Sequence, residues 1–360
     1  MTTKENILKA LSACQDPEIG KDIVSLGMVR DLSVENGKVR FDFVLTTPAC
    51  PLKSQMENAA REAVLKVPGV KAVDINMTAA VKKDARLERA LPPGVKNLLA
   101  VGSGKGGVGK SCVAANLAVS LAKEGAAVGL LDADVYGPNQ HQMFGVRDYV
   151  PKPDSEDKIA PAEAHGVKLF SMGFLMDPDS PAIWRGPMLH GAVIQFLKDV
   201  RWGELDYLIV DLPPGTGDVQ LSLCRTAPLT GAVIVTTPQS IALSDVRKAV
   251  AMFKQLKVPI LGVIENMSVF ACPHCGNTSR VFGEGGAKKL SEMHNIPRLG
   301  SVPLDPTVCE SGETGTPMAL AHPDSPTTAA FRKLAGQVAV QVSLRHHEGK
   351  RAGADLVGAS

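Results

Sequence analysis

Runs of apolar residues without polar alternation recur along most of the chain beyond Asn97, and helical patterns separate one run from the next. Such runs are typical of strands buried on both faces, as in a parallel sheet that helices cover on both sides. This pattern predicts an α/β fold with a mainly parallel sheet. The runs predicted to form its strands are Leu98–Gly102, Ala127–Leu131, Val167–Ser171, Tyr207–Val210, Ala232–Thr236, Ile260–Ile264 and Arg298–Val302.

The first part of the chain shows a different pattern. Residues Lys38–Leu45 alternate between polar and apolar side chains, as a half-buried strand does. An Asn36-Gly37 turn precedes this run, so the residues before the turn are its predicted hairpin partner. Together these patterns predict an α-β-β-α-β unit. Its other predicted elements are a helix over 3–14, strands Met28–Val34 and Val70–Met77, and a helix Leu52–Lys66.

These patterns divide the chain into four segments. Residues 1–81 are predicted to be a small α+β domain, and the charged, proline-containing stretch 82–96 a linker. Residues 97–344 are predicted to form the large α/β domain, whose last helix runs from Thr327 to Leu344. Residues 345–360 lack both periodicity and an apolar face, so we expect a disordered tail.

Composition excludes several classes of function. The 360 residues include 39 Lys and Arg against 37 Asp and Glu, a net charge of +2 that attracts neither nucleic acid nor anionic membranes. No apolar run approaches the roughly 18 residues of a membrane span, and no secretory signal pattern is present. The seven cysteines are an odd number and mostly scattered. We therefore expect a cytoplasmic protein with reduced thiols and with no nucleic-acid or membrane partner.

A glycine-rich loop follows the first strand of the large domain and leads into a predicted helix, Ser111–Glu124. Its backbone N–H groups and the helix N-terminus are suited to hold phosphate groups, with Lys110 reaching the β- and γ-phosphates and the Ser111 hydroxyl binding Mg²⁺. The same glycines also fit the weaker dinucleotide fingerprint, which has no use for a Lys-Ser pair. The loop residues predicted to bind ATP are Gly104, Lys105, Gly106, Gly107, Val108, Gly109, Lys110 and Ser111.

Acidic residues follow two of the predicted strands, where the carboxyl ends of a parallel sheet face the ligand. Asp211 ends an apolar run and is predicted to hold Mg²⁺ through water. Asp132 is predicted near the metal and Asp134 beside the attacking water, with helix capping as the alternative. The loop after Asp211 contains Pro214 and Gly215, and its flexibility predicts a switch that senses the γ-phosphate.

Cys272 and Cys275 form a C-x-x-C pair followed by Gly276. Two thiolates do not complete a zinc site or an iron–sulfur cluster, each of which normally takes four ligands. Two copies of the pair at a dimer axis would supply four thiolates. A structural zinc knuckle stays an alternative, and a thiol redox couple is disfavoured because the pair does not begin a helix.

The loop sequence GKGGVGKS resembles the deviant Walker A ATPases, which include MinD, ParA and the nitrogenase iron protein. This resemblance implies that Lys105 reaches the nucleotide of the partner subunit in a dimer, and that Asn266 recognises adenine. The longer set GKGGVGKS, DADVYGPN, WRGPM, DLPPGTGD, IENMS and CPHCG resembles the Mrp/ApbC family of iron–sulfur cluster carriers. The small domain resembles the PaaD and SufT cluster-assembly proteins through Asp16-Pro17-Glu18 and the TTPACP stretch ending at Pro51.

The resemblance implies a homodimeric, Mg²⁺-dependent ATP hydrolase with Lys105, Lys110 and Asp134 as its catalytic residues. It also implies a [4Fe-4S] cluster bridging two subunits through Cys272 and Cys275, with scaffold and recipient apoproteins as partners. A MinD/ParA-type positioning ATPase with a structural zinc knuckle is the main alternative, and an electron-donating reductase is a third.

The remaining cysteines carry weaker predictions. Cys50 precedes a predicted helix whose N-terminus would lower the pKa of its thiol, so it is a possible accessory thiol that passes or receives iron, with an inert thiol as the alternative. Four single cysteines are expected to fill small apolar spaces. They are Cys14, Cys112, Cys224 and Cys309.

Overall fold

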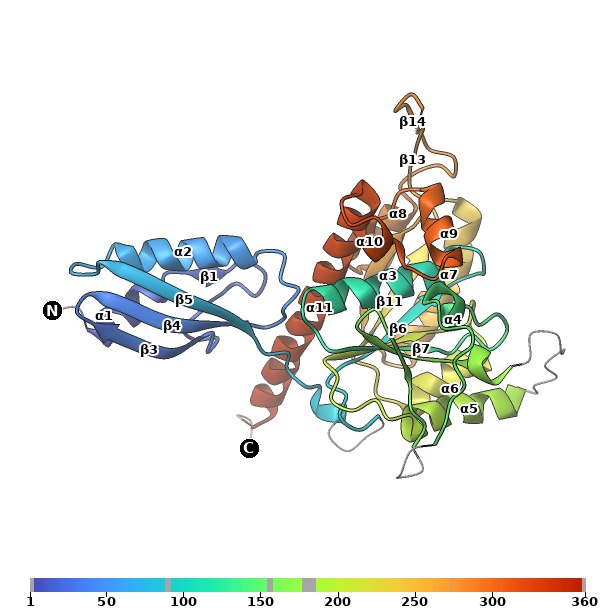
Figure 1. Cartoon of the computed structure of the whole chain (residues 1–360), viewed down its shortest axis with the longest axis horizontal. Helices are drawn as coiled ribbons and strands as arrows, with labels where there is room; N and C mark the ends of the chain where they lie inside the picture. Colours follow the sequence, from blue (N-terminus) through green and yellow to red (C-terminus); the bar gives the residue numbers. More distant parts are fainter. Residues whose placement is uncertain (1–2, 88–91, 154–157, 177–185, 273, 358–360) are drawn as a thin grey trace. The chain divides into compact units, whose positions relative to one another are not determined.

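The computed structural model describes residues 3–87, 92–153, 158–176, 186–272 and 274–357. The chain divides into two compact units, Met1–Lys82 with Ala339–Ser360, and Lys83–Val338 (Figure 1).

The small unit contains a three-stranded sheet in the order β3-β4-β5, with β4 antiparallel to β3 and parallel to β5. The apolar residues of the alternating strand, Val39, Phe41, Phe43 and Leu45, are buried against Met56 and its neighbours on α2. The predicted α-β-β-α-β order is confirmed, with a short extra strand pair before β3. The bounds are α1 Lys4–Leu11, β1 Gln15–Asp16, β2 Lys21–Asp22, β3 Val29–Glu35, β4 Lys38–Leu45, α2 Lys53–Leu65 and β5 Ala72–Ala79.

The large unit is built on an eight-stranded sheet, and every predicted strand is present within two residues of its expected bounds. All neighbouring strands are parallel except β8, an antiparallel edge strand that the sequence analysis did not predict. The order across the sheet is β15 (Arg298–Ser301), β12 (Ile260–Glu265), β11 (Gly231–Thr236), β6 (Leu98–Ser103), β10 (Tyr207–Asp211), β7 (Val128–Asp132), β9 (Val167–Ser171) and β8 (Ala162–Ala164).

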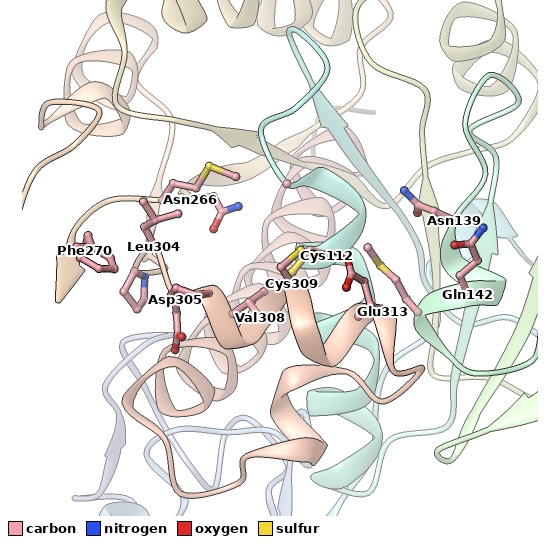
Figure 2. A pocket seen from close by; sticks show the side chains of 16 residues that line it. Cys112, Asn139, Gln142, Asn266, Phe270, Leu304, Asp305, Val308, Cys309 and Glu313 are labelled. Atoms are coloured by element: carbon pink, nitrogen blue, oxygen red, sulfur yellow. Dashed lines mark hydrogen bonds between the residues drawn. The ribbon is translucent and has the colours of Figure 1, made fainter. Parts of the chain in front are cut away.

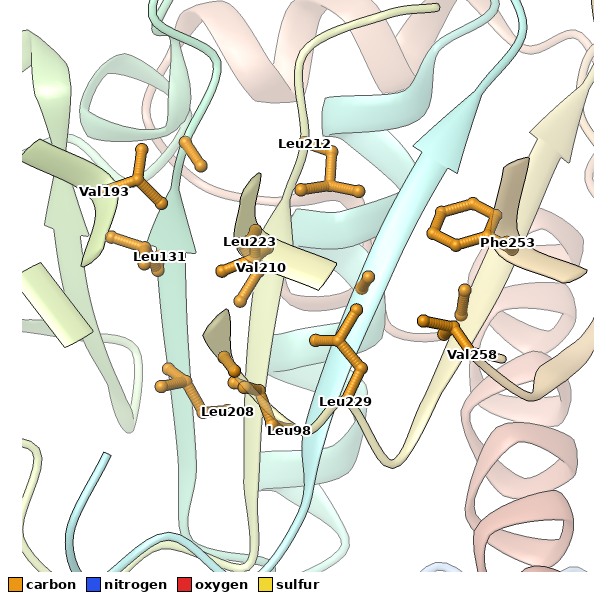
Figure 3. Packing of buried hydrophobic residues seen from close by; sticks show 14 of the residues in the cluster. Leu98, Leu131, Val193, Leu208, Val210, Leu212, Leu223, Leu229, Phe253 and Val258 are labelled. Atoms are coloured by element: carbon orange, nitrogen blue, oxygen red, sulfur yellow. The ribbon is translucent and has the colours of Figure 1, made fainter. Parts of the chain in front are cut away.

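Helices cover both faces of this sheet because its strands are apolar on both sides. On one face, side chains such as Leu131, Leu208 and Val210 belong to a buried apolar cluster that also includes Phe253 of α7 (Figure 3). On the other face, α3 lies against β6, β7, β10 and β11. The helix bounds are α3 Lys110–Lys123, α4 Gln140–Met143, α5 Gly186–Asp199, α6 Asp218–Thr226, α7 Ser240–Gln255, α8 Gly286–His294, α9 Pro306–Glu313, α10 Met318–Ala321 and α11 Pro326–Val357.

Two segments differ from the sequence prediction. The predicted disordered tail is wrong up to Val357, because α11 continues past Leu344. Six of the 13 residues in this extension are Arg, Glu, Lys or Ala, which favour a helix, and extending a helix that has already nucleated is far easier than starting one. In the predicted linker, Leu87 and Val95 are buried in the core of the large unit, and residues 88–91 lie outside the described residues. Across the described part of the chain, no helix is long and apolar enough to cross a membrane.

Candidate functional site

The predicted nucleotide residues meet at the carboxyl edge of the large sheet. The glycine-rich loop follows β6, while Asp132 and Asp211 end β7 and β10 and pair with each other in strand register. Asn266 follows β12. Strand topology thus brings together residues that are more than 160 positions apart in the chain, at the edge where open α/β sheets bind ligands.

The backbone of the glycine-rich loop depends on glycine at particular positions. Gly107 and Gly109 have positive φ values of 76° and 78°, which other residues rarely adopt. Gly104 lies against the backbone of α7, where an added Cβ would stand 2.7 Å from the Val246 Cα. The Asn266 side-chain amide donates to the Val108 carbonyl at 2.9 Å, which joins the loop to the end of β12.

Lys110 lies among carboxylates within the protein. Its ammonium group contacts Asp211 Oδ1 directly and lies 3.7 Å from Asp134 Oδ2. Lys110 is only 5% exposed and Asp211 is fully buried. Burial raises the pKa of Asp134, which the positive charge of Lys110 partly offsets. A carboxylate whose pKa is raised is a stronger base and is better suited to accept a proton from water.

Both carboxylate oxygens of Asp132 accept hydrogen bonds from the protein. Its Oδ2 accepts hydrogen bonds from the Asn139 and Gln140 backbone N–H groups, both at 3.0 Å, and from the Ser171 hydroxyl at 2.8 Å. Its Oδ1 accepts the Asp134 N–H. Burial and the nearby Asp211 charge raise the pKa of Asp132. Asp132 therefore fixes the loop between β7 and α4, and its metal role stays a prediction.

Gln140 is a site residue that the sequence analysis missed. Its side-chain Nε2 donates to Asp211 Oδ2 and to the Ser111 carbonyl, both at 2.9 Å. It is the first residue of α4 and is completely buried. The position after Asn139 in the loop gave no signal, because a glutamine next to a helix start is ordinarily a surface residue.

The predicted switch loop is tied to the glycine-rich loop. The Gly215 N–H donates to the Ser103 carbonyl at 3.0 Å, so this predicted γ-phosphate sensor already has an acceptor. The Gln220 side chain donates to the carbonyls of Pro213, Pro214 and Gly215. Lys105 Nζ lies 3.4 Å from Gln239 Oε1 of the same chain. To bind the γ-phosphate, the Gly215 N–H would have to give up its hydrogen bond to the Ser103 carbonyl.

An apolar pocket of about 480 Å³ lies beside the glycine-rich loop. We call it the P-loop pocket. Its wall includes Gly109 and Asn266, the residue predicted to recognise adenine. Figure 2 shows Cys112 and Cys309 between its two ends, which are marked by Asn266, Phe270 and Leu304 and by Asn139 and Gln142. Its position and its largely apolar wall suit the base and sugar of a nucleotide.

The residues at this edge fit both Mg²⁺ and ATP. Asp132, Asp134 and Asp211 are buried around the single ammonium of Lys110, so a divalent cation would offset the excess negative charge. Carboxylate and hydroxyl oxygens are the ligands that Mg²⁺ prefers. Ser111 would hold the metal and Asp211 would hold it through water, while the N-terminus of α3 would bind the phosphates.

The cysteine pair lies on a small hairpin formed by β13 (Phe270–Ala271) and β14 (Thr278–Ser279). The backbone at the root of the hairpin is bonded to the wall of the P-loop pocket. The Ser268 N–H donates to the Val302 carbonyl at 3.0 Å, and the Leu304 N–H donates to the Val269 carbonyl at 2.8 Å. The chain therefore runs from Asn266 to the cysteines along a segment that is fixed to the nucleotide side of the sheet.

Both thiols of this hairpin are accessible, with Cys272 half-buried and Cys275 exposed. Backbone N–H groups of His274 and Cys275, and the Cys275 thiol, lower the pKa of Cys272 and favour its thiolate. Among the described residues, no group of three or more His, Cys, Asp and Glu side chains could hold a metal ion. One chain thus provides two soft ligands at this tip; Pro273 lies outside the described residues.

The thiol pKa of Cys50, in the small unit, differs from the one expected from the sequence. Burial, together with the weaker effects of the Glu18 and Asp16 charges, raises the pKa of its thiol to about 11. A bond involving the Leu52 backbone has the opposite effect but is outweighed. The expected lowering by the helix N-terminus is therefore wrong. Burial and Asp16 also raise the pKa of Glu18 to about 7, so Cys50 and Glu18 each hold their protons more tightly than usual.

The single cysteines divide into two groups. Cys14 and Cys224 are partly buried against the two cores, in keeping with their prediction as fillers, while Cys112 is partly buried but also lines the P-loop pocket. Cys309 is exposed in the P-loop pocket, because α9 presents it to the cavity rather than to the core, so its prediction was wrong. Two residues of the WRGPM motif, Trp184 and Arg185, lie outside the described residues.

Comparison with protein families gives two matches. The family described as NUBPL iron-transfer P-loop NTPase matches residues 94–339. The family described as iron-sulfur cluster assembly protein matches residues 4–76. The first match covers most of the large unit, and the second covers most of the N-terminal segment of the small unit.

Individual proteins give the same result. An iron-sulfur cluster carrier protein of Deinococcus radiodurans is 53% identical over 339 residues, covering 94% of this chain and 95% of that protein. Among solved structures, a nucleotide-binding protein of Archaeoglobus fulgidus in complex with ADP is 40% identical, with a TM-score of 0.56 over 64% of this chain and 88% of that one. The cell division ATPase MinD of Pyrococcus furiosus is 25% identical, with a TM-score of 0.51 over 67% and 98%.

Proposed function

Because the chain belongs to the family of NUBPL iron-transfer P-loop NTPases, we propose that it is an ATP-hydrolysing carrier of an iron–sulfur cluster. Two copies of the chain hold a [4Fe-4S] cluster through Cys272 and Cys275 and deliver it to recipient apoproteins. The observation that carries this proposal is the accessible thiol pair on a hairpin whose root is bonded to the wall of the P-loop pocket.

Each part of the nucleotide site has a role in ATP hydrolysis. The backbone N–H groups of the glycine-rich loop bind the phosphates, and Asn266 contacts the adenine in the P-loop pocket. Mg²⁺ offsets phosphate charge when it is bound. Lys110 leaves Asp211 to reach the β- and γ-phosphates, and Asp134 accepts a proton from the attacking water. Lys105 leaves Gln239 and reaches the nucleotide of the partner subunit.

The iron–sulfur cluster is held by thiolate ligands from both subunits. Two thiolates from each subunit give the four ligands that a [4Fe-4S] cluster takes, and two-fold symmetry places like residues opposite each other. The tip is accessible, so an apoprotein can approach the cluster. In the small unit, Cys50 is an accessory thiol that stays protonated until it meets iron, with Glu18 beside it.

ATP acts as a switch through the hairpin root. Residues 302–304 are bonded to the root of the hairpin, and Pro303 and Leu304 also line the P-loop pocket. Filling the pocket with nucleotide shifts this wall and with it the hairpin, which changes the exposure of the cluster. Cluster-release rates of the wild type and Lys110→Ala, with and without ATP, test the switch; equal rates would exclude it.

Anaerobic reconstitution with iron and sulfide tests the cargo. We expect wild-type protein to turn brown, to hold about four irons per dimer and to elute as a dimer. The double variant Cys272→Ala/Cys275→Ala should stay colourless, and Cys224→Ala, a partly buried thiol, should behave as wild type. A colourless wild type with stoichiometric zinc would contradict cluster carriage and favour a MinD-type positioning ATPase with a zinc knuckle, the second candidate.

A further inference from the structure

Gln140 joins three elements of the nucleotide site. Its backbone N–H is bonded to Asp132 at the end of β7, and its side-chain Nε2 donates to Asp211 at the end of β10 and to the Ser111 carbonyl in α3. All three distances lie between 2.9 and 3.0 Å. A completely buried side chain with this many partners has a single orientation.

The other end of the same side chain lacks a partner. Within the described residues, Gln140 Oε1 is a buried oxygen with no hydrogen-bond donor, and so is Asn139 Oδ1 beside it in the sequence. Buried polar atoms nearly always have partners, so we expect these two oxygens to accept hydrogen bonds from water or from a ligand. Asn139 also lines the P-loop pocket. Gln140 does not line this pocket, but its bond to Asp211 places it at the same edge of the sheet, where ATP is expected.

The side-chain amide of Gln140 holds the Asp211 carboxylate. One oxygen of this carboxylate contacts the Lys110 ammonium and the other accepts the Gln140 amide. When Lys110 turns to the phosphates, the Gln140 amide remains to hold the carboxylate in one orientation. A carboxylate that binds metal through water needs such an outer partner, since these partners set the orientation of metal ligands.

We propose that Gln140 is a positioning residue for magnesium: its amide fixes Asp211, and its Oε1 accepts a hydrogen bond from water in the magnesium–ATP complex. This inference rests on the proposed ATP-binding function. Gln140 acts through Asp211 and water and does not touch the reacting phosphate. Its effect is therefore on magnesium affinity and not on the binding of ATP alone.

The test replaces the amide while keeping the length of the side chain. We would titrate Mg²⁺ into full-length wild type and Gln140→Met in the presence of a fluorescent ATP analogue, and would first measure binding of the analogue in EDTA. We expect Gln140→Met to bind the analogue in EDTA as the wild type does, and to need about tenfold more Mg²⁺ for half-maximal response. Gln255→Met, on an exposed end of α7, is the matched control and should follow the wild type.

Other outcomes contradict the inference in distinct ways. An unchanged Mg²⁺ midpoint in Gln140→Met overturns it, and so does an equal loss of binding with and without Mg²⁺, which would give Gln140 a purely structural role. A wild type without Mg²⁺-dependent binding would instead contradict the proposed function. If thermal denaturation shows that Gln140→Met does not fold, Gln140→Leu takes its place under the same criteria.

Discussion

Lys110 is the residue on which the stability of the nucleotide-free site depends. Its ammonium contacts the fully buried Asp211 and lies near Asp134, with Asp132 also buried at the same edge. Removing one partner of a buried ion pair leaves a charge without compensation, which costs far more than loss of a surface pair. The lysine that is predicted to bind phosphate thus also stabilises the empty site.

Lys110→Met should lower the free energy of unfolding of the nucleotide-free protein by about 3 kcal/mol. The reason is that the Asp211 carboxylate stays buried without its cation. Urea denaturation measures the change, and Lys248→Met, which removes an exposed pair with Asp245, should cost less than about 1 kcal/mol. Equal effects of the two substitutions would show that the Lys110 pair contributes no more than a surface pair.

Glu18 makes the stability of the small unit depend on pH. Its pKa is raised to about 7 from 4.5, so the folded state binds this proton more tightly than the unfolded state does. The favourable contribution is complete below pH 4.5 and is lost as the pH rises through 7. Above that pH the folded unit holds a half-buried carboxylate near Asp16.

Glu18→Gln should therefore stabilise the small unit at pH 8 and have little effect at pH 4.5. The expected gain at pH 8 is on the order of 1 kcal/mol after allowance for solvent screening. Hydrogen exchange of peptides from β3 and β4 in urea reports this unit in the full chain. Glu62→Gln, on the exposed side of α2, is the control. A gain that does not change between the two pH values would contradict the assigned pKa.

At the scale of elements, tight packing fixes the glycine-rich loop against α7. Gly104 has no room for a Cβ because the backbone of Asp245 and Val246 lies against it. A Cβ on Gly106 would meet only Pro214, at 4.0 Å. Two glycines of one motif thus serve different purposes, one in packing and the other in approach to the ligand.

Gly104→Ala should push the loop away from α7, lower the free energy of unfolding by about 2 kcal/mol and weaken ATP binding. Gly106→Ala should leave the unfolding free energy within about 0.5 kcal/mol of the wild type, since its Cβ has space. Thermal denaturation and calorimetric ATP titration measure the two effects. Similar stabilities of the two variants would show that α7 moves to accommodate the added methyl group.

Elements with strong periodicity were predictable from the sequence. The continuous apolar runs gave all seven strands of the parallel core, and the glycine-rich loop gave its helix, because burial on both faces and phosphate binding leave clear patterns. The edge strand β8 was missed because three residues show no periodicity. Gln140 was missed because its burial results from long-range contacts with Asp211 and Ser111. For Cys50, desolvation outweighed the helix N-terminus, a balance that spacing alone does not reveal.

At the scale of the whole molecule, the proposed function requires two chains. The hairpin provides two thiols, and Lys105 is proposed to act on the partner's nucleotide. Each active site then combines Lys110 from one chain with Lys105 from the other. Although both lysines belong to one sequence motif, substitutions of Lys105 and Lys110 can therefore be placed in different chains, and their effects on one active site can be told apart.

Lys105→Ala and Lys110→Ala should each abolish ATP hydrolysis, and an equal mixture of the two chains should recover about a quarter of the wild-type rate. Random pairing makes about half of the dimers mixed, and each mixed dimer has one intact site of two. Steady-state phosphate release measures the rate. No recovery on mixing, under conditions where subunits exchange, would show that Lys105 acts in its own chain.

The attachment of the hairpin has a consequence for how new carriers could arise. Its strands are largely exposed, and its root is held by backbone hydrogen bonds to residues 302–304 that do not depend on the side chains of the tip. The residues from Asn266 to Cys272 span at most about 21 Å when fully extended. The tip is therefore a short module that tolerates sequence change without disturbing the fold. Exchange of Cys272 and Cys275, the two residues proposed as ligands, should redirect the molecule to a different metal cargo while the nucleotide site is kept intact.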